Sequence, residues 1–316
     1  MEVPIPYIHK SHSNLIKRCS KQLELKDILK LTPSHINESS LAGSAFHNFT
    51  EQIYLSTKTD KWDDWKYWVE FWVNDFQKRK NDVLSKDIEL HNAEDIKAEE
   101  FAEMIVEFLK QRWNRNAQPI LLEAPFRFTL KRGKQTYGFE GRIDQLLKIQ
   151  WVDLPPHFQR QLLELNSRPT KDYIYLHRDI KTGTRRHMSE IELTCDDNIM
   201  YYSYALAYGS FDLAGTGDYS YRPKLIPYAH ALYYTRDHLK YKRKTGEHVA
   251  GDYKGQGMYF IRKDLDDLKR MEVELINLWR KINSGIYTRD GQATNLCDRY
   301  CGFKHMCLHD WNTNGH

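Results

Sequence analysis

Two stretches of the sequence decide the fold class: LLEAPFRFTLKRGKQTYGFEGRIDQLLKIQ, residues 121–150, and DYIYLHRDIKTG, residues 172–183. Apolar and polar residues alternate along the first stretch, as in half-buried strands, and Arg132-Gly133-Lys134 supplies a turn in its middle. The second stretch has the composition of a further strand. We therefore predict a β-hairpin followed by another strand.

Helical periodicity dominates the sequence before this hairpin, and helices and strands alternate after it. Residues 38–80 and 94–115 have apolar residues at helical spacing. Trp62, Trp65, Trp68 and Trp72 follow the same spacing, and we expect a buried stripe, with a base-stacking platform as the alternative. The other expected elements are short helices over 14–29 and 157–165, a helix over 190–208, a strand over 226–236, a basic loop over 237–257 and an amphipathic helix over 262–284. This order predicts one α/β domain over 1–316, with a helical part over 1–118, an α/β core over 119–285 and a tail over 286–316.

Charge and composition set limits on the class of protein. The chain of 316 residues has 47 Lys and Arg against 43 Asp and Glu, a net charge of +4, which permits a nucleic-acid partner without demanding one. It has no apolar run long enough to span a membrane, and its start, MEVPIPYIHK, lacks the pattern of a signal peptide. We expect an intracellular, cytoplasmic protein, or a nuclear or mitochondrial one if its source is eukaryotic.

Three of the five cysteines are clustered near one end of the sequence. The five are Cys19, Cys195, Cys297, Cys301 and Cys307. Three cysteines within a short segment favour a metal site over disulfides in a chain without a secretion signal. The distant fourth ligand is Cys19 or Cys195, of which Cys195 precedes a helical pattern and reads as an inert buried thiol. His305 or His309 could replace a cysteine as a ligand, so a zinc site is a further possibility. The remaining alternative is that the cysteines are unrelated free thiols.

Two carboxylates and a lysine are the candidate chemical groups. Asp179 and Lys181 are two residues apart on the predicted strand and therefore share a face. If Asp144 lies on the neighbouring strand, two carboxylates form a hard oxygen site for Mg²⁺ or Mn²⁺, beside a lysine that can orient water and stabilise charge on a phosphate. His47 is a plausible third ligand. The alternatives are an exposed Asp–Lys pair and an ordinary core or surface histidine. Glu123 on the first strand is a candidate carboxylate that supports the metal ligands, although a surface or salt-bridged glutamate is the favoured interpretation.

These motifs, in this order, resemble a known family. The matching segments are Gly43 to His47, Gly141 to Asp144, Asp179 to Gly183, Asn198 to Tyr202 with Asn in place of Gln, and Ser11 to Cys19 with the three late cysteines. Together they are similar to the PD-(D/E)xK nucleases, and more narrowly to the RecB-type branch, which includes the AddB nuclease, the CRISPR adaptation nuclease and the exonuclease V group. The chain departs from the pattern in the C-x₃-C spacing of its first late cysteines and in a longer segment between Asp144 and Asp179.

The resemblance implies a fold and a role for each matching residue. The implied fold is a restriction-endonuclease-like mixed sheet with a helical N-terminal part and a cysteine-cluster tail. The implied ligands of the catalytic Mg²⁺ or Mn²⁺ are His47, Asp144, Asp179 and the backbone carbonyl of Ile180. Lys181 would position the attacking water, and Tyr202 and Asn198 would hold Lys181 or a phosphate. Cys19, Cys297, Cys301 and Cys307 would bind a structural [4Fe–4S] cluster.

The resulting expectation is a metal-dependent deoxyribonuclease. The resemblance implies an exonuclease that prefers single strands, in DNA repair, recombination or CRISPR-type DNA processing, with a helicase or an integrase as a candidate partner. The basic residues expected to face DNA are Arg185, Arg186, Lys242, Arg243 and Lys244, with solvated turns as the alternative. The rival interpretation is a non-catalytic nucleic-acid-binding module with a structural cluster or zinc site.

Overall fold

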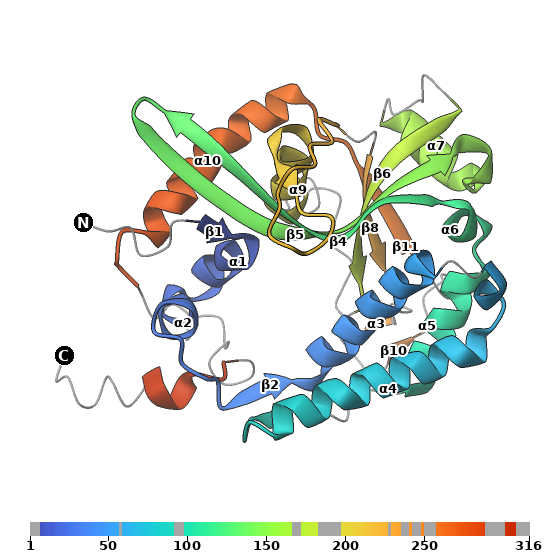
Figure 1. Ribbon diagram of the computed structural model, residues 1–316, viewed down its shortest axis with the longest axis horizontal. Coiled ribbons are helices and arrows are strands. Elements are labelled where there is room, and N and C mark those ends of the chain that lie inside the picture. Colours follow the sequence, from blue (N-terminus) through green and yellow to red (C-terminus); the bar gives the residue numbers. More distant parts are fainter. Residues whose placement is uncertain are drawn as a thin grey trace.

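A mixed sheet of seven strands runs through the protein (Figure 1). The computed structural model describes residues 7–56, 59–91, 98–165, 172–182, 197–226, 229–234, 240–241, 248–249, 257–287 and 301–307. The strands are β1 (Tyr7–His9), β2 (His35–Asn37), β3 (Glu89–His91), β4 (Gln118–Arg132), β5 (Gln135–Gln150), β6 (Tyr173–Lys181), β7 (Ser210–Phe211), β8 (Ala229–Tyr234), β9 (Lys240–Tyr241), β10 (His248–Val249) and β11 (Gly257–Ile261). The main sheet has the order β11-β8-β6-β5-β4-β7, and β1 also pairs with β5.

Helices cover both faces of this sheet. The α-helices are α1 (Lys10–Arg18), α2 (Ser20–Leu23), α3 (Glu38–Leu55), α4 (Trp65–Leu84), α5 (Ala98–Lys110), α6 (Arg112–Asn116), α7 (Pro156–Glu164), α9 (Asp197–Tyr208) and α10 (Leu265–Ile282). Shorter turns are the π-helix η1 (Glu24–Ile28) and the 3₁₀ turns η2 (Thr59–Trp62) and η4 (Trp151–Asp153). The protein is therefore a mixed α/β fold, as the order of the sequence patterns predicts. Among the described residues, no helix is long and apolar enough to cross a membrane.

The predicted hairpin is confirmed as β4 and β5, and local sequence explains its shape. Gly133 occupies the turn with a φ of 63°, a left-handed conformation that glycine adopts without steric cost. Burial alternates along β4 from Ala124 to Leu130, which places one face of the hairpin against the core. Gly141 on β5 leaves room for the ring of Phe126, since a Cβ there would lie 2.7 Å from the ring.

Two strands pair with the same edge of β5 from opposite ends. β1 runs parallel to β5 and ends at the pair His9–Glu140, while β6 runs antiparallel to β5 and has Arg178 opposite Gln145. Both strands therefore approach the segment Gly141–Asp144 with their C-terminal ends. Residues that follow β1 and residues that close β6 are brought together at this segment, although they are far apart in the sequence.

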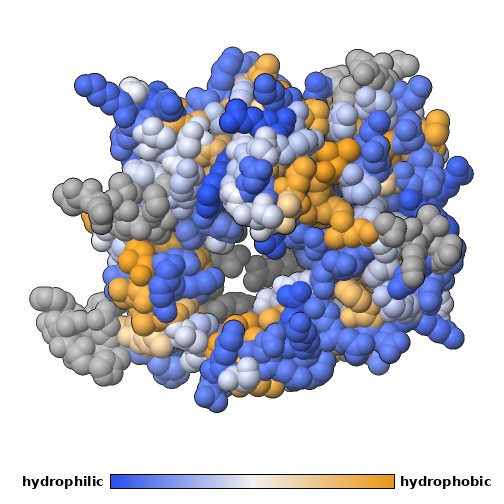
Figure 2. Space-filling model, in the orientation of Figure 1, coloured by the Kyte–Doolittle hydropathy of each residue, from blue (hydrophilic) through white to orange (hydrophobic). Residues whose placement is uncertain are grey.

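Two hydrophobic clusters meet at this point. One cluster packs α3, α4 and α5 against β5 and β6, and its members include Phe46, Phe49, Trp72 and Ile180. The other packs α1, α9 and α10 against the β4–β5 hairpin and includes Ile143 and Tyr202. The space-filling view shows a hollow near the centre of one face, between the N-terminal helices and α3, with a largely hydrophilic border (Figures 1 and 2).

The helical region before the hairpin differs from the prediction. The expected helix over 38–80 is broken into α3 and α4, because Asp64 caps a new helix by accepting a hydrogen bond from the Tyr67 backbone N–H at 3.1 Å. Trp62, Trp68 and Trp72 are buried, but Trp65 is 46% exposed at the first turn of α4. The expected helix over 94–115 is likewise divided, into α5 and α6. The expected basic loop over 237–257 contains the short antiparallel pair β9–β10.

The N-terminal part and the C-terminal tail are in contact. The backbone N–H of Ser34 donates a hydrogen bond of 2.7 Å to the carbonyl of Gly302, and its hydroxyl donates to the same carbonyl at 3.0 Å. Leu25 packs with Cys301 and Phe303 in a small apolar cluster. A Cβ on Gly302 would lie 2.6 Å from the carbonyl oxygen of His35, so glycine permits this close approach.

Candidate metal centre

Helix α3 carries His47 to the end of β6. The Asn37 side chain accepts a hydrogen bond from the Ser39 backbone N–H at 3.0 Å, and this cap starts the helix at Glu38. Gly43, one turn before His47, lies against Thr182 so closely that a Cβ would be 2.8 Å from the Thr182 Oγ1. Because glycine has no side chain, the helix approaches the strand end closely enough for His47 to reach it.

His47 links three other groups at this position. Its Nδ1 lies 3.1 Å from Glu123 Oε1 and 3.6 Å from Asp144 Oδ2, and its Nε2 lies 3.1 Å from the carbonyl oxygen of Ile180. An imidazolium donates through both nitrogens, and this arrangement offers each nitrogen an acceptor. Although burial alone would lower it, the charges of Asp144 and Glu123 raise the pKa of His47 to about 9.

His47, Glu123 and Asp144 together form a group that can hold a metal ion. Their ligand atoms all lie within 4.8 Å of one another. The carboxylate oxygens suit Mg²⁺ or Mn²⁺, and the imidazole nitrogen is a ligand that divalent transition metals accept. The carbonyl oxygen of Ile180, close to His47 Nε2, is a fourth potential ligand atom. The positive charge of the protonated His47 offsets the negative charge of the carboxylates. A bound cation would supply this positive charge instead.

Glu123 was weighed from the sequence as a carboxylate that supports the metal ligands, but a surface or salt-bridged residue was the favoured interpretation. It lies on β4 with a φ of 42°, a left-handed conformation that is uncommon for a non-glycine residue and is found at functional sites. This backbone conformation interrupts the regular alternation of the strand close to its register shift between Pro119 and Leu121. The sequence favoured a salt-bridged surface carboxylate, whereas the structure brings Glu123 to His47 with 18% of its side chain exposed.

Asp144 and Asp179 lie next to each other but differ in charge state. Asp144 Oδ2 accepts a hydrogen bond of 3.1 Å from the backbone N–H of Ile180. Burial, together with the charge of Asp179, raises the pKa of Asp144 to about 7. Burial would raise the pKa of Asp179 too, but Lys181 and Lys10 outweigh it and hold that pKa below its usual range. Asp179 is therefore ionised while Asp144 titrates near neutrality.

Lys181 completes the predicted strand motif. Its Nζ lies 2.5 Å from Asp179 Oδ2, so the two side chains share a face as their spacing predicts. Asp179 is 1% exposed, whereas a third of the Lys181 side chain is exposed. The lysine can therefore reach solvent or a substrate from a position anchored to a buried carboxylate.

A buried arginine on the opposite face of β6 supports the strand. Arg178 is fully buried and donates through Nη1 to Asn114 Oδ1 at 2.6 Å and through Nε to Gln145 Oε1 at 2.7 Å. Its Nη2 also donates to the hydroxyl of Tyr54 at 3.2 Å. These contacts connect β6 to β5, α6 and α3 directly behind Asp144 and Asp179. Nothing in the local sequence pattern distinguishes Arg178 from an exposed strand residue.

Tyr202 lies beside His177, which is two residues before Asp179 on β6. It is 2% exposed, its hydroxyl accepts a hydrogen bond of 2.6 Å from Lys10 Nζ, and its ring is 4.7 Å from that of His177. Burial, the largest influence, lowers the pKa of His177 to about 3, so this imidazole is neutral. Asn198 is one helical turn before Tyr202 on α9. The contact of Tyr202 with Lys10 is one that the sequence did not indicate.

The remaining expected residues are only partly described. Arg185, Arg186, Lys242, Arg243, Lys244, Cys195 and Cys297 lie outside the described residues. Cys19 and Cys301 are buried and Cys307 is half-buried. Cys301 and Cys307 belong to the same apolar cluster as Leu25. Among the described residues, no group of three potential ligands includes a cysteine.

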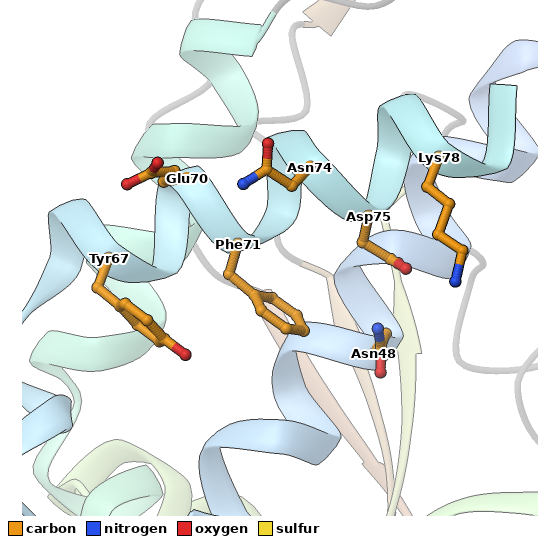
Figure 3. Close-up of a pocket in the computed structure, with 7 residues that line it drawn as sticks. All are labelled: Asn48, Tyr67, Glu70, Phe71, Asn74, Asp75 and Lys78. Carbon is orange, nitrogen blue, oxygen red and sulfur yellow. The ribbon is translucent and has the colours of Figure 1, made fainter. Parts of the chain in front are cut away.

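A second concave surface lies between α3 and α4 and is separate from the metal centre. The residues that line this groove are Asn48, Tyr67, Glu70, Phe71, Asn74, Asp75 and Lys78 (Figure 3). Tyr67 and Phe71 point from α4 toward α3, where Asn48 directly follows His47. Its acidic and basic side chains are mixed, and Asp75 is paired with Arg79 at 2.7 Å. Among the described residues, the group of three potential metal ligands is the one around His47, and none of its members lines this groove.

Comparisons with known proteins do not identify a family for this chain. No family model and no curated protein matches it. A solved structure titled "Crystal structure of SSO0001" is similar over 96% of this chain and 86% of that chain, with 14% sequence identity and a TM-score of 0.36. A likeness this distant carries no argument about fold or function. The function is therefore inferred from the geometry of the metal centre.

Proposed function

We propose that this protein is a Mg²⁺- or Mn²⁺-dependent nuclease that hydrolyses DNA phosphodiester bonds. The observation that carries the proposal is the convergence of His47, Glu123 and Asp144 beside the Asp179–Lys181 pair. A hard-cation site next to a lysine is the combination that phosphodiester hydrolysis requires, since negative charge develops on the phosphate. The resemblance of the motifs to RecB-type nucleases supports the same reaction.

The core that we propose for this activity is of the restriction-endonuclease-like type. In support, the mixed sheet brings Asp144 on β5 and Asp179 and Lys181 on β6 to one point, in the chain order that the family motifs have. The exonuclease mode and the preference for single strands come from the resemblance alone. The proposed setting is DNA repair, recombination or CRISPR-type processing, with a helicase or an integrase as partner.

Each side chain at the centre has a proposed part in the reaction. The cation, when bound, would polarise the phosphate and lower the pKa of a water ligand. The cation would be held by His47, Asp144, Asp179 and the Ile180 carbonyl. Glu123 joins this set because of its position beside His47. Lys181 is held at Asp179 in a position to orient the attacking water and to stabilise negative charge on a phosphate oxygen. The water oxygen forms the new bond to phosphorus, and the bond to the leaving sugar oxygen breaks as that oxygen takes up a proton.

A [4Fe–4S] cluster bound by Cys19, Cys297, Cys301 and Cys307 remains part of the proposal. Thiolates are the ligands that such clusters use, and three come from one short segment. In support, Cys301 and Cys307 pack against Leu25, six residues beyond Cys19, and the Ser34–Gly302 hydrogen bonds hold the tail against the N-terminal part. The proposed role is structural, because it would join the two ends of the chain.

The test is a cleavage assay on end-labelled single and double strands with Mg²⁺, Mn²⁺ or EDTA. Asp144→Asn, Asp179→Asn and Lys181→Met should each reduce cleavage by ~10²-fold or more, the size of effect seen when a charge-stabilising group is removed. The matched control is Asp266→Asn, which changes an exposed carboxylate on α10 and should leave cleavage unchanged. Cleavage in EDTA, or full cleavage by Asp179→Asn, would overturn the proposal. Nucleic-acid binding without any cleavage would favour the non-catalytic module.

A further inference from the structure

Arg142 is a charged residue beside the metal centre to which the resemblance assigns no part. It lies on β5 two residues before Asp144, so the two side chains share one face of the strand and their Cα atoms are ~7 Å apart. On this face Asp144 reaches His47, as Glu123 does from β4. Asp144 is 9% exposed, whereas Arg142 is exposed. The strand therefore carries a guanidinium on the solvent side of the metal ligands.

The pairing of β4 with β5 explains why this arginine lacks a partner. Arg127 and Glu140 are directly opposite each other on the two strands and form an ion pair of 3.1 Å. Arg142 instead has Pro125 opposite it, and the proline side chain has no acceptor. Within the part of the chain that the structure describes, the Arg142 guanidinium takes part in no hydrogen bond or ion pair. Its donors are therefore available to a ligand.

Glu51 on α3 shows toward which side of the sheet the guanidinium lies. Glu51 is one helical turn after His47. Burial and the charge of Glu123 raise the pKa of Glu51, whereas Arg142 lowers it. The positive charge of Arg142 is thus felt at the face of α3 that also carries His47. The guanidinium lies on the same side of the sheet as the metal ligands.

The sheet leaves this part of β5 uncovered along one edge. β1 pairs with residues 138–140 of β5, and β6 pairs with residues 145–150. Residues 141–144 therefore face no described strand on that edge, so a nucleic-acid backbone can approach Arg142 there. Neighbouring positions on one face of a sheet are within reach of long side chains. A phosphate bound to a cation at Asp144 is consequently within reach of Arg142.

We infer that the Arg142 guanidinium binds the phosphate that is cleaved at the metal centre. This inference rests on the proposed function and adds a substrate contact to it. The planar guanidinium can donate two parallel hydrogen bonds to two phosphate oxygens, and it stays charged at every physiological pH. Negative charge develops on these oxygens as water attacks, so the contact strengthens during the reaction. Arg142 would then hold the phosphate from β5 while Lys181 orients the water from β6.

The experiment measures single-turnover cleavage of a single-stranded oligonucleotide with Mg²⁺ or Mn²⁺ over a range of protein concentrations. Arg142→Ala should lower the rate at saturation by ~10²-fold, the effect of removing a charge-stabilising group, and should change the half-saturating protein concentration much less. Arg142→Lys should recover part of this loss, because it keeps the charge but not the fork. Guanidinium chloride, well below concentrations that unfold proteins, should restore part of the rate to Arg142→Ala.

The matched control is Arg132→Ala, which removes an exposed arginine at the turn end of the same hairpin, ~30 Å from Asp144 along the strands. It should cleave like the wild type with or without guanidinium, and both alanine variants should keep the wild-type melting temperature.

Three results would overturn the inference while the proposed function stands. Arg142→Ala cleaves at the wild-type rate, or its lost rate is recovered neither by guanidinium nor by Arg142→Lys, or the change is confined to the half-saturating concentration. The last result would place Arg142 against another part of the strand. If the wild type cleaves no DNA with either cation, the proposed function itself falls, and this inference falls with it.

Discussion

His47 and Asp144 hold protons at the place where a cation would bind. The pKa of His47 is raised to about 9, mainly by Asp144 and Glu123 against the opposing effect of burial, and burial raises the pKa of Asp144 to about 7. A metal ligand must be deprotonated, so cation binding at this centre has to release these protons. Residues that look like simple ligands in the sequence are therefore coupled to pH by their surroundings.

The pH dependence of metal binding follows from these two shifts. His47 contributes stability that is present below its ordinary pKa of 6.5 and is lost as the pH rises toward 9. Asp144 has a raised pKa, so its burial costs stability increasingly as the pH rises from 3.8 to about 7. The metal-free protein should therefore lose stability over this range, while its affinity for Mg²⁺ or Mn²⁺ rises.

We predict that saturating Mn²⁺ raises the melting temperature only slightly at pH 5.5 and several times more at pH 8.5, as measured by differential scanning fluorimetry. Calorimetry in two buffers of different ionisation enthalpy should show proton release on binding near pH 7. His47→Gln should remove most of the pH dependence above pH 7. A gain in melting temperature that is the same at both pH values would show that these groups do not bind the ion.

At the scale of helices and strands, the close approach of α3 to the end of β6 depends on Gly43. The cost of a side chain there is set by Thr182, whose Oγ1 would lie 2.8 Å from a new Cβ. Glycine in a helix costs ~1 kcal/mol of stability relative to alanine. The packing of α3 against the end of β6 has to offset this cost. Overpacking of this kind costs ~1–3 kcal/mol, which exceeds the gain from helix propensity.

A change of sign in a double-mutant cycle tests this balance. Gly43→Ala should destabilise the protein by up to about 2 kcal/mol in the wild-type background, because the cost of overpacking is offset in part by the gain in helix propensity. It should also weaken metal binding, because His47 moves with the helix. In a Thr182→Ala background, where Oγ1 is absent, the same substitution should stabilise the protein by about 1 kcal/mol. Urea unfolding of the four proteins measures both values. Stabilisation by Gly43→Ala in both backgrounds would mean that α3 and β6 are not in close contact.

At the scale of the whole molecule, described residues of the N-terminal part and of the C-terminal tail are in contact. Ser34 bonds to Gly302, and Leu25 packs with Cys301 and Phe303. A cluster bound by Cys19 and the late cysteines would close almost the entire chain into one loop. Such a cross-link removes about 4–5 kcal/mol of unfolded-state entropy if the estimate for disulfides applies, and metal binding adds to folding as well.

We therefore predict that Cys19→Ser loses iron and lowers the melting temperature, whereas Cys195→Ser keeps the iron. Iron analysis and the visible spectrum after anaerobic purification, together with a thermal melt, measure both effects. Iron loss from Cys195→Ser, with retention by Cys19→Ser, would show that the fourth ligand is wrong. Zinc in place of iron would show that the site is a structural zinc site. Neither result would change the assignment of Asp144, Asp179 and Lys181.

Much of the core was predictable because its signals are local. The Gly133 turn and the alternation on either side of it specify the β4–β5 hairpin from adjacent residues. The two-residue spacing of Asp179 and Lys181 is enough to place both on one face of a strand. The break between α3 and α4 was missed because the spacing of the tryptophans continues the helical pattern across it, although Asp64 caps a new helix.

What the sequence by itself determined is therefore the mixed α/β class, the hairpin and the Asp–Lys strand, since each depends on periodicity or on turn chemistry within a few residues. Only the tertiary structure decided which other side chains reach that strand. Glu123 arrives through a left-handed backbone conformation within β4, and Lys10 through the parallel pairing of β1 with residues 138–140 of β5. The β1–β5 pairing joins segments more than a hundred residues apart, and Glu123 and His47 are 76 residues apart. Neither contact can be predicted from a local spacing in the sequence.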